Sequence, residues 1–184
     1  MTSIVSAKTL VATVAAAVAI TGAFFMTQPA DAGLELALCQ GYAPTIMGTP
    51  GNDNITGTNG LDVIMAGSGN DKINGLAGND IICAGPGNDR VNGGDDNDSI
   101  FGESGDDRLR GGEGLDLVRG GSNDDLVQGE DGDDQLFGDD GVDVVEGGDG
   151  DDYMGGGSGS PDHCDGGLGD DFFTSSCETV IDYI

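Results

Sequence analysis

Aspartate recurs every nine residues through the middle of this chain. Numbering each nine-residue unit so that the aspartate is sixth, the eighth place is always Ile, Val, Leu or Met, and the first place is Gly except at Ala66 and Ala84. Such a fixed period predicts a solenoid built from stacked repeats. Twelve units keep the register without a shift, with aspartates at Asp53, Asp62, Asp71, Asp80, Asp89, Asp98, Asp107, Asp116, Asp125, Asp134, Asp143 and Asp152.

The unit itself predicts a turn followed by a short strand. Glycines at the first, second and fourth places favour a turn over the first six residues, because glycine tolerates positive φ and close backbone contact. The last three residues then form a strand whose middle side chain, the aliphatic eighth residue, points inside. Two units close one coil of 18 residues, so twelve units predict about six coils, which stack to roughly 29 Å.

Stacking the coils also stacks the aspartates, and the chain has few cations to neutralise them. Its 184 residues include 34 Asp and Glu against 6 Lys and Arg, a formal net charge of -28. The repeated places offer only carboxylate and carbonyl oxygens, which suit a hard cation with flexible coordination. Calcium fits this donor set better than magnesium, which requires stricter octahedral geometry.

The repeat resembles the calcium-binding nonapeptide of the repeats-in-toxin, or hemolysin-type, family, written G-G-x-G-x-D-x-U-x. Residues 147–155, Gly-Gly-Asp-Gly-Asp-Asp-Tyr-Met-Gly, match it closely. The resemblance implies an all-β fold, a right-handed parallel β-roll with terminal caps, in which sixth-place aspartates and backbone carbonyls hold calcium between successive coils. Twelve units then provide up to about ten calcium ions, and Asp171, in a later unit, is a thirteenth candidate ligand.

An acidic, glycine-rich disordered chain is the alternative for this composition. Disorder predicts scattered apolar residues, whereas all twelve eighth places are aliphatic. Without calcium the disordered state is favoured, because each coil buries only two medium-sized side chains against carboxylate repulsion. Folding and calcium binding are therefore expected to be one event.

The first 32 residues are typical of an export signal. Lys8 precedes an apolar run from Leu10 to Phe25, and Ala30-Asp31-Ala32 offers a cleavage site after Ala32. The run is shorter than a membrane span of about 20 residues, so no membrane span is expected. A lipoprotein site at Cys39 is disfavoured by the bulky Leu38. We therefore expect a signal peptide over 1–32, a capping segment over 33–47, the repeats over 48–155, a C-terminal cap over 156–184, and a secreted protein.

Four cysteines in an exported chain predict two disulfides, with three possible pairings. Cys164 and Cys177 flank the end of the repeats, so we favour their pairing, which leaves Cys39 for Cys83. This arrangement of cysteines resembles that of secreted bacterial calcium-binding proteins of the same family.

The repeat degenerates near the C-terminus. Ser160-Pro161 occupy the places expected of the fifth residue and the aspartate, and the unit containing Asp171 is displaced by one residue. The residues beyond it predict a hydrophobic cap that closes the solenoid, as repeat folds require. The expected cap residues are Phe172, Phe173, Val180, Ile181 and Ile184.

Alternate units lie on the same side of a solenoid, so the two outer faces can be separated in sequence. One face collects four cations, Lys72, Arg90, Arg108 and Arg110. The other is more apolar and contains Cys83, so we expect the leading segment, with Leu34, Leu36 and Leu38, to cover its first coils. Its remaining residues form a candidate surface for a protein partner or self-association, namely Phe101, Leu117, Phe137 and Tyr153.

Catalysis is not expected. Adjacent acids such as Asp106-Asp107 have a simpler role in the repeat, and the chain has one His, no Trp and no separate domain to enclose a pocket. The charge excludes nucleic acid as a partner. We expect a secreted calcium-binding β-roll with a structural or surface-interaction role. The alternatives are an adhesin-like recognition solenoid, for which no regular Thr or Asn array appears, and an orphan calcium-binding module of a toxin or exoenzyme system.

Overall fold

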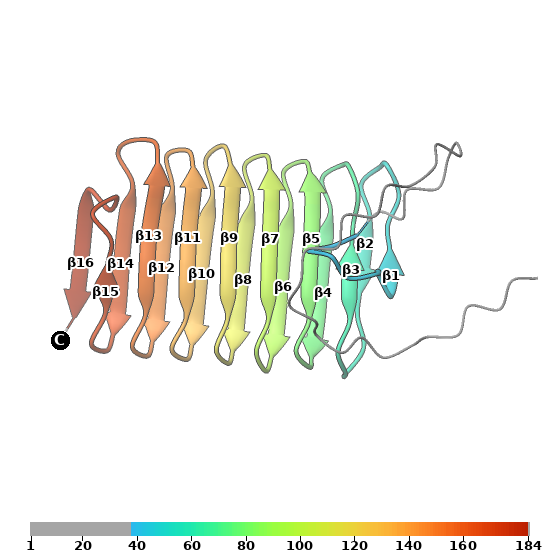
Figure 1. The fold of residues 1–184 in the computed structure, drawn as a ribbon, viewed down its shortest axis with the longest axis horizontal. Coiled ribbons are helices and arrows are strands. Elements are labelled where there is room, and N and C mark those ends of the chain that lie inside the picture. Colours follow the sequence, from blue (N-terminus) through green and yellow to red (C-terminus); the bar gives the residue numbers. More distant parts are fainter. Residues whose placement is uncertain (1–37, 184) are drawn as a thin grey trace, which may run out of the picture. The chain divides into compact units, whose positions relative to one another are not determined.

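The computed structural model describes residues 38–183, whose regular structure is entirely β-strand (Figure 1). Within that range no helix has the length and apolarity needed to cross a bilayer. The expected signal peptide, with Leu34 and Leu36 beyond it, lies outside the described residues. The strands are β1 (Ile46–Met47), β2 (Asn54–Thr56), β3 (Val63–Met65), β4 (Lys72–Ala77), β5 (Ile81–Pro86), β6 (Arg90–Asp95), β7 (Ser99–Ser104), β8 (Arg108–Glu113), β9 (Leu117–Ser122), β10 (Leu126–Asp131), β11 (Gln135–Asp140), β12 (Val144–Asp149), β13 (Tyr153–Ser158), β14 (His163–Leu168), β15 (Phe172–Phe173) and β16 (Thr179–Tyr183).

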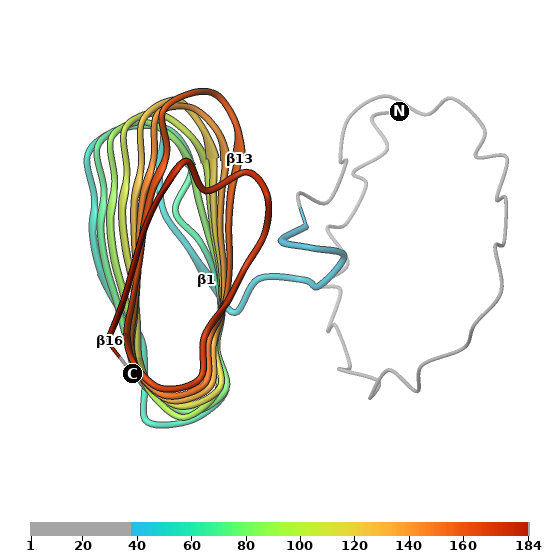
Figure 2. The same ribbon diagram turned by 90° about the vertical axis from the view of Figure 1, so that its left-hand side faces the viewer.

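The strands form two parallel eight-stranded sheets, and successive strands alternate between them. We call them the odd sheet (β1 to β15) and the even sheet (β2 to β16). The ladder pairs residues 18 apart, as in Val127↔Val145, so each coil contains two nine-residue units. Viewed along the stack, the coils superimpose as closed loops with one sheet on each side (Figure 2). The fold is the expected all-β parallel solenoid.

The number of coils is larger than expected. Eight strands in each sheet make about eight coils, whereas twelve regular units predicted about six. The additional strands are β1, which precedes the first aspartate, and β14 to β16, where the strict spacing is lost. Backbone pairing does not require the nonapeptide signature, so the sheets extend past both ends of the regular repeat.

The strands of the central coils are also longer than expected. The sequence predicted three residues, but β10 spans six, from the seventh place of one unit to the third place of the next. Pairing continues through Glu130↔Gly148 and Asp131↔Asp149. The turn that carries the aspartate is therefore confined to the fourth to sixth places. It is tight enough that a β-carbon on Gly132, at φ +135°, would lie 1.6 Å from the carbonyl oxygen of Gly114.

The core consists of the eighth-place side chains, as predicted. Each sheet contributes one inward residue per coil, and the residues of the central coils are 0–1% exposed, apart from Val91 at 4%. Ala66 and Ala84, at the first place, join the same cluster. Because each coil supplies only two such side chains, the core is a narrow double row along the stack. Its buried members include Ile64, Ile73, Ile82, Val91, Ile100, Leu109, Val118, Val127, Leu136, Val145 and Met154.

Two disulfides hold the ends of the roll. Cys39 is bonded to Cys83, and Cys164 to Cys177, which is the favoured pairing. Cys39 is fully buried beside Val63 and Cys83, so the leading segment does contact the odd sheet. The expectation for Leu38 was wrong, because its side chain is 48% exposed.

The hydrophobic cap forms only in part. Phe173 packs against the core together with Cys177. Phe172 was wrongly assigned to the cap, because it occupies an outward-facing seventh place and is 59% exposed. Val180 pairs with Cys164 in the ladder, but no further coil covers it and it is 46% exposed. Ile184 lies outside the described residues.

Candidate metal sites between successive coils

The sixth-place acids form two columns, one along each edge of the stack where a turn enters a strand. Each acid directly precedes the first residue of a strand, and adjacent coils bring equivalent acids one strand spacing apart, about 4.8 Å. From Asp62 to Asp162 these aspartates are 1–5% exposed. One column contains Asp53, Asp71, Asp89, Asp107, Asp125, Asp143 and Asp162, and the other contains Asp62, Asp80, Asp98, Asp116, Asp134, Asp152 and Asp171.

From Asp71 onward, one carboxylate oxygen of each acid joins its coil to the coil before it. The backbone N–H of Asp107, for example, donates to Oδ1 of Asp125 at 2.8 Å. The same bond recurs seven times along one column and six times along the other, at 2.7–3.0 Å. The acids therefore have a structural role in stacking that is separate from any ion they hold.

The second carboxylate oxygen, Oδ2, is buried and accepts no hydrogen bond in most of these residues. Burying an unpaired polar atom is costly, and more so when it carries charge. A repeated set of such atoms indicates that a positively charged ligand belongs beside them. The residues concerned are Asp71, Asp80, Asp89, Asp98, Asp107, Asp116, Asp125, Asp134, Asp143, Asp152 and Asp162.

Carbonyl oxygens converge on the same positions. A β-carbon placed on Gly120 would lie 2.4 Å from Oδ2 of Asp125 and 2.6 Å from the carbonyl oxygen of Gly138 in the next coil. At Gly75 the corresponding distances, to Asp80 and Gly93, are 2.4 and 2.5 Å. The first-place glycine thus leaves open a space lined by oxygens from two coils. In two units the first residue is alanine instead, Ala66 or Ala84, and its methyl group occupies this space.

Burial makes the columns strongly unfavourable as bare anions. It raises the pKa of Asp125 to about 8 and those of Asp98, Asp107 and Asp134 to about 7. The hydrogen bond from the neighbouring coil lowers these pKa values, but burial outweighs it, and nearby carboxylates raise them further. A cation beside Oδ2 would remove this penalty.

The donor set fits calcium. No group of three or more His, Cys, Asp or Glu side chains that could hold an ion occurs within residues 38–183. An ion between two coils must therefore use backbone carbonyls as well as carboxylates. Calcium accepts six to eight oxygens of both kinds in flexible geometry, whereas soft metals prefer thiolate or imidazole.

The first two units differ from the others. Oδ2 of Asp53 accepts from the N–H of Thr49, and Oδ2 of Asp62 from the N–H of Thr58, both at 2.6 Å. Threonine at the second place leaves its N–H directed at the carboxylate, so these two acids have an internal partner. The predicted ligands with unpaired Oδ2 atoms begin at Asp71.

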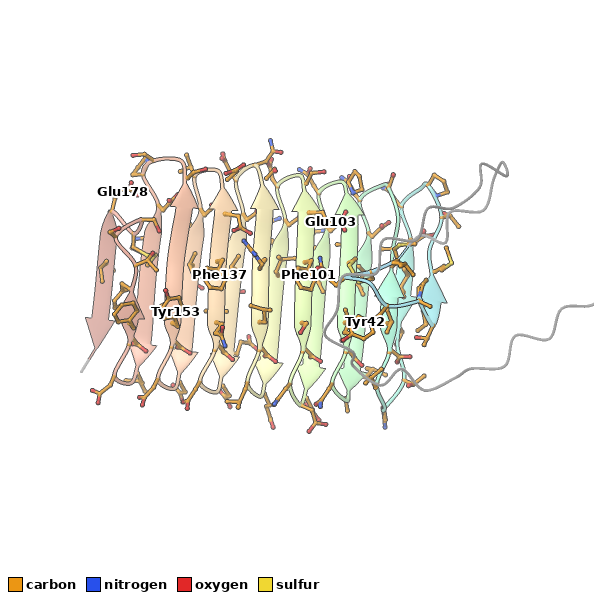
Figure 3. The ribbon with its side chains drawn as sticks, viewed as in Figure 1. Tyr42, Phe101, Glu103, Phe137, Tyr153 and Glu178 are labelled. Carbon is orange, nitrogen blue, oxygen red and sulfur yellow. A yellow bond between two sulfur atoms is a disulfide. The ribbon has the colours of Figure 1, made fainter. Side chains whose placement is uncertain are left out.

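Two acids that sequence reasoning missed extend one column. Asp162 was overlooked because Ser160-Pro161 stood at the expected places, but its Oδ1 accepts from the N–H of Asp143 at 3.0 Å. Glu178 continues the column, since its Oε2 accepts from the N–H of Asp162 at 2.7 Å (Figure 3). One inserted residue displaces the register. The sequence did carry a signal that the register resumes, because Cys164 stands two places after Asp162, as the eighth-place residue does after each aspartate.

Asp171, the thirteenth candidate ligand, lies at the end of the other column. Its Oδ1 accepts from the N–H of Asp152 at 3.0 Å, across a sequence separation of 19 instead of 18. The columns thus tolerate the displaced register that the inserted residue creates.

Comparison with known proteins identifies the repeat. The family model of the RTX calcium-binding nonapeptide repeat matches overlapping segments that together run from residue 47 to residue 161, more than half of the chain. No match to a curated protein was found.

Proposed function

Because the chain belongs to the family of RTX calcium-binding nonapeptide repeats, we propose that it is a secreted protein whose roll folds as it binds extracellular calcium, and that it acts structurally or as an interaction module. Calcium binding by the β-roll follows from the family, and we propose export, coupled folding and the biological role in addition.

The observation that carries coupled folding is the row of buried Oδ2 atoms without hydrogen-bond partners. We propose ions between successive coils, held by Oδ2 of the sixth-place acids and by first-place carbonyl oxygens. Bound calcium would supply the positive charge that the stacked carboxylates lack. The thirteen inter-coil acid pairs allow more positions than the ten expected from twelve units.

Export is supported by the two disulfides, since such bonds persist in oxidising compartments outside the cytosol. The apolar run before residue 33 is consistent with this route. Extracellular calcium is abundant enough to load weak sites, whose dissociation constants are typically about 10⁻⁴ to 10⁻³ M. Export would thus deliver the chain to the ion that it needs to fold.

We propose no enzymatic activity for this chain. The acids that could resemble a catalytic pair belong to the stacking columns, as Asp107 does, or bond to an adjacent coil, as Asp106 does through Asn88. An activity that persists through purification and depends on a residue outside the columns would contradict this.

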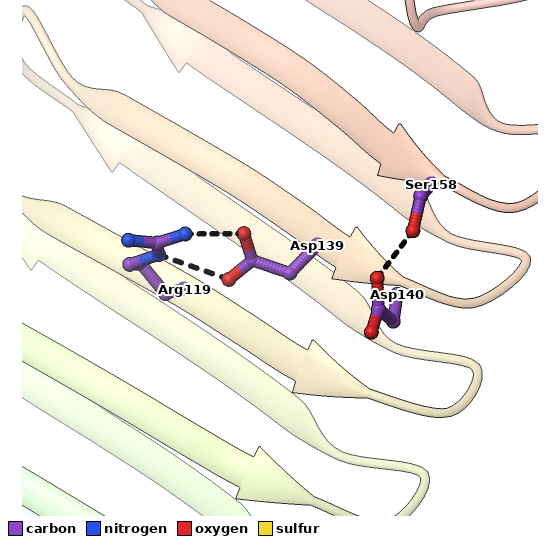
Figure 4. Close-up of polar contacts among 4 residues, drawn as sticks. All are labelled: Arg119, Asp139, Asp140 and Ser158. Atoms are coloured by element: carbon purple, nitrogen blue, oxygen red, sulfur yellow. Dashed lines mark hydrogen bonds and ion pairs between the residues drawn. The ribbon is translucent and has the colours of Figure 1, made fainter.

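The outer face of the odd sheet is proposed as a contact surface for a partner or another copy. Tyr153 stacks on Phe172 with ring centroids 5.1 Å apart, and Phe137 lies 5.9 Å from Tyr153 (Figure 3). Arg119 lies over Phe137 and pairs with Asp139, Nε to Oδ2 at 2.9 Å (Figure 4). We expect the variant F137S/Y153S to lose binding to the partner or to the other copy, while its melting temperature stays unchanged.

Calcium titration of the chain beginning at Gly33, followed by circular dichroism, tests the main proposal. We expect cooperative gain of β structure with calcium and little with magnesium. A chelator should reverse the change. If EDTA leaves both the spectrum and the melting temperature unaltered, coupled folding is refuted.

A further inference from the structure

The outer face of the even sheet carries a column of cations on an otherwise acidic protein. Lys72, Arg90 and Arg108 are the first residues of β4, β6 and β8, and the ladder pairs them directly, Lys72↔Arg90 and Arg90↔Arg108. All three side chains are exposed. The ion pairs within residues 38–183, Arg110–Glu130 and Arg119–Asp139, do not include them. Like charges placed side by side on a sheet repel. The three cations therefore destabilise one another, and neither of these ion pairs offsets that repulsion.

A column of acids lies at the opposite end of the same strands. Asp95, Glu113, Asp131 and Asp149 are the last residues of β6, β8, β10 and β12, and the ladder pairs them in turn. They are exposed. They border a groove whose floor includes the second-place glycines Gly94, Gly112 and Gly148. The same face therefore carries a positive column, a groove and a negative column, all with the spacing of the coils.

These columns are complementary under one particular symmetry. A two-fold axis parallel to the stack, placed outside this face, reverses the strand direction and preserves the order of coils. It sets Arg90 opposite Asp95 of the second copy and Arg108 opposite Glu113, and the reciprocal contacts make four ion pairs. A two-fold axis parallel to the strands would instead set cations against cations.

The groove accommodates two of the ninth-place side chains. Under the same symmetry Asn92 falls opposite Gly93 and Gly94 of the second copy, and Arg110 opposite Gly111 and Gly112, where no side chain obstructs either one. Arg110 is already paired with Glu130 of its own chain, at 2.8 Å, so it brings no unpaired charge to the contact. Eight strands of up to six residues present roughly 700 Å², close to the approximately 800 Å² per partner of a standard interface.

We propose that two folded copies associate through the even sheet, in parallel and in register, as a two-fold symmetric dimer. The pairing rests on the proposed function in one respect, since calcium must keep the roll folded and reduce the net charge of -28. Complementary columns of this kind fix register and choice of partner more than they add affinity.

Sedimentation equilibrium in calcium at low salt tests the proposal, with circular dichroism of each sample to establish that it is folded. We expect wild-type protein to dimerise, and added salt to weaken the dimer because the pairs are exposed. R108E should weaken association at least about tenfold, because both copies lose a pair and gain a repulsion. R119E makes the same charge change on the odd sheet and should have little effect.

A charge reversal on both columns completes the test. R90E/R108E and D95R/E113R should each be monomeric, and the combined four-residue variant should dimerise again. A wild-type protein that is folded but monomeric overturns the dimer while leaving the calcium proposal standing. Equal weakening by R108E and R119E, or weakening by F137S/Y153S instead, also overturns it. Failure to fold in calcium would refute the proposed function itself.

Discussion

Oδ1 of Asp125 accepts a hydrogen bond from the backbone N–H of Asp107, 18 residues earlier, while Oδ2 of the same carboxylate is buried without a partner. One side chain therefore contributes two separable properties. Its Oδ1 accepts the hydrogen bond that joins two coils, and the charge on its buried carboxylate requires a cation. An aspartate does both in a tight turn, which explains why a single residue type recurs through the repeat.

Replacing Asp125 with Asn should separate these properties. The amide keeps an acceptor for the N–H of Asp107 but removes the charge, so D125N should require several-fold more calcium to fold. In chelator the same variant should keep more β structure than wild type, because a buried anion has been removed. Circular dichroism in chelator and during calcium titration measures both effects.

The matched control is D124N. Asp124 is the exposed neighbour, and its Oδ1 accepts from the N–H of Val142 at 2.9 Å, a bond that Asn retains. The charge change is identical, but no buried oxygen is involved. Equal shifts of the calcium midpoint in D124N and D125N would show that only net charge matters.

The calcium-free chain should become more stable as the pH falls. In the folded roll, burial raises the pKa of Asp125 to about 8 and that of Asp107 to about 7, above the ordinary value of 3.8. Between these values the folded state binds more protons than the unfolded chain, so the stability is present at low pH and is lost as the pH rises. In EDTA the chain should therefore show more β structure by circular dichroism at about pH 5.5 than at about pH 8. A change in the opposite direction would contradict the burial of uncompensated carboxylates.

Glu103 should be a site of local backbone strain. It occupies the second place with φ 74°, between Gly85 and Gly121 in the ladder, and its side chain is exposed. A left-handed conformation costs a non-glycine residue about 1–2 kcal/mol, so E103G should stabilise the calcium-loaded roll by about 1 kcal/mol. E103A removes the same charge but keeps the β-carbon, and it should recover much less. Urea denaturation in saturating calcium distinguishes them.

The disulfide between Cys164 and Cys177 should hold the last coil. It closes a short loop, with a sequence separation of 13, for which removal of a crosslink costs about 3 kcal/mol. In C164A/C177A we expect hydrogen exchange to accelerate in β14 to β16 while β8 stays protected. C39A/C83A should affect the first coils instead. Uniform acceleration in both variants would mean that the roll unfolds as one unit.

The sequence determined the period, the inward side chain and the acid columns. These follow from local patterns, because residues equivalent to Asp107 and Leu109 recur every nine places whatever their neighbours are. It also separated the two outer faces, because alternate units must lie on the same side of a coil. The prediction of calcium as the bound ion followed from the oxygen donors of the repeat and from the net charge of -28.

Only the tertiary structure decided where the coils stop and how each acid is used. Backbone pairing continues without the signature, so β1 and β16 join the sheets, and Asp162 and Glu178 enter a column despite the shifted spacing. Thr49 partners Asp53, whereas Oδ2 of Asp71 has no hydrogen-bond partner. The reason is physical: a hydrogen bond depends on where the next coil places its N–H and carbonyl groups, and a linear repeat does not contain that information.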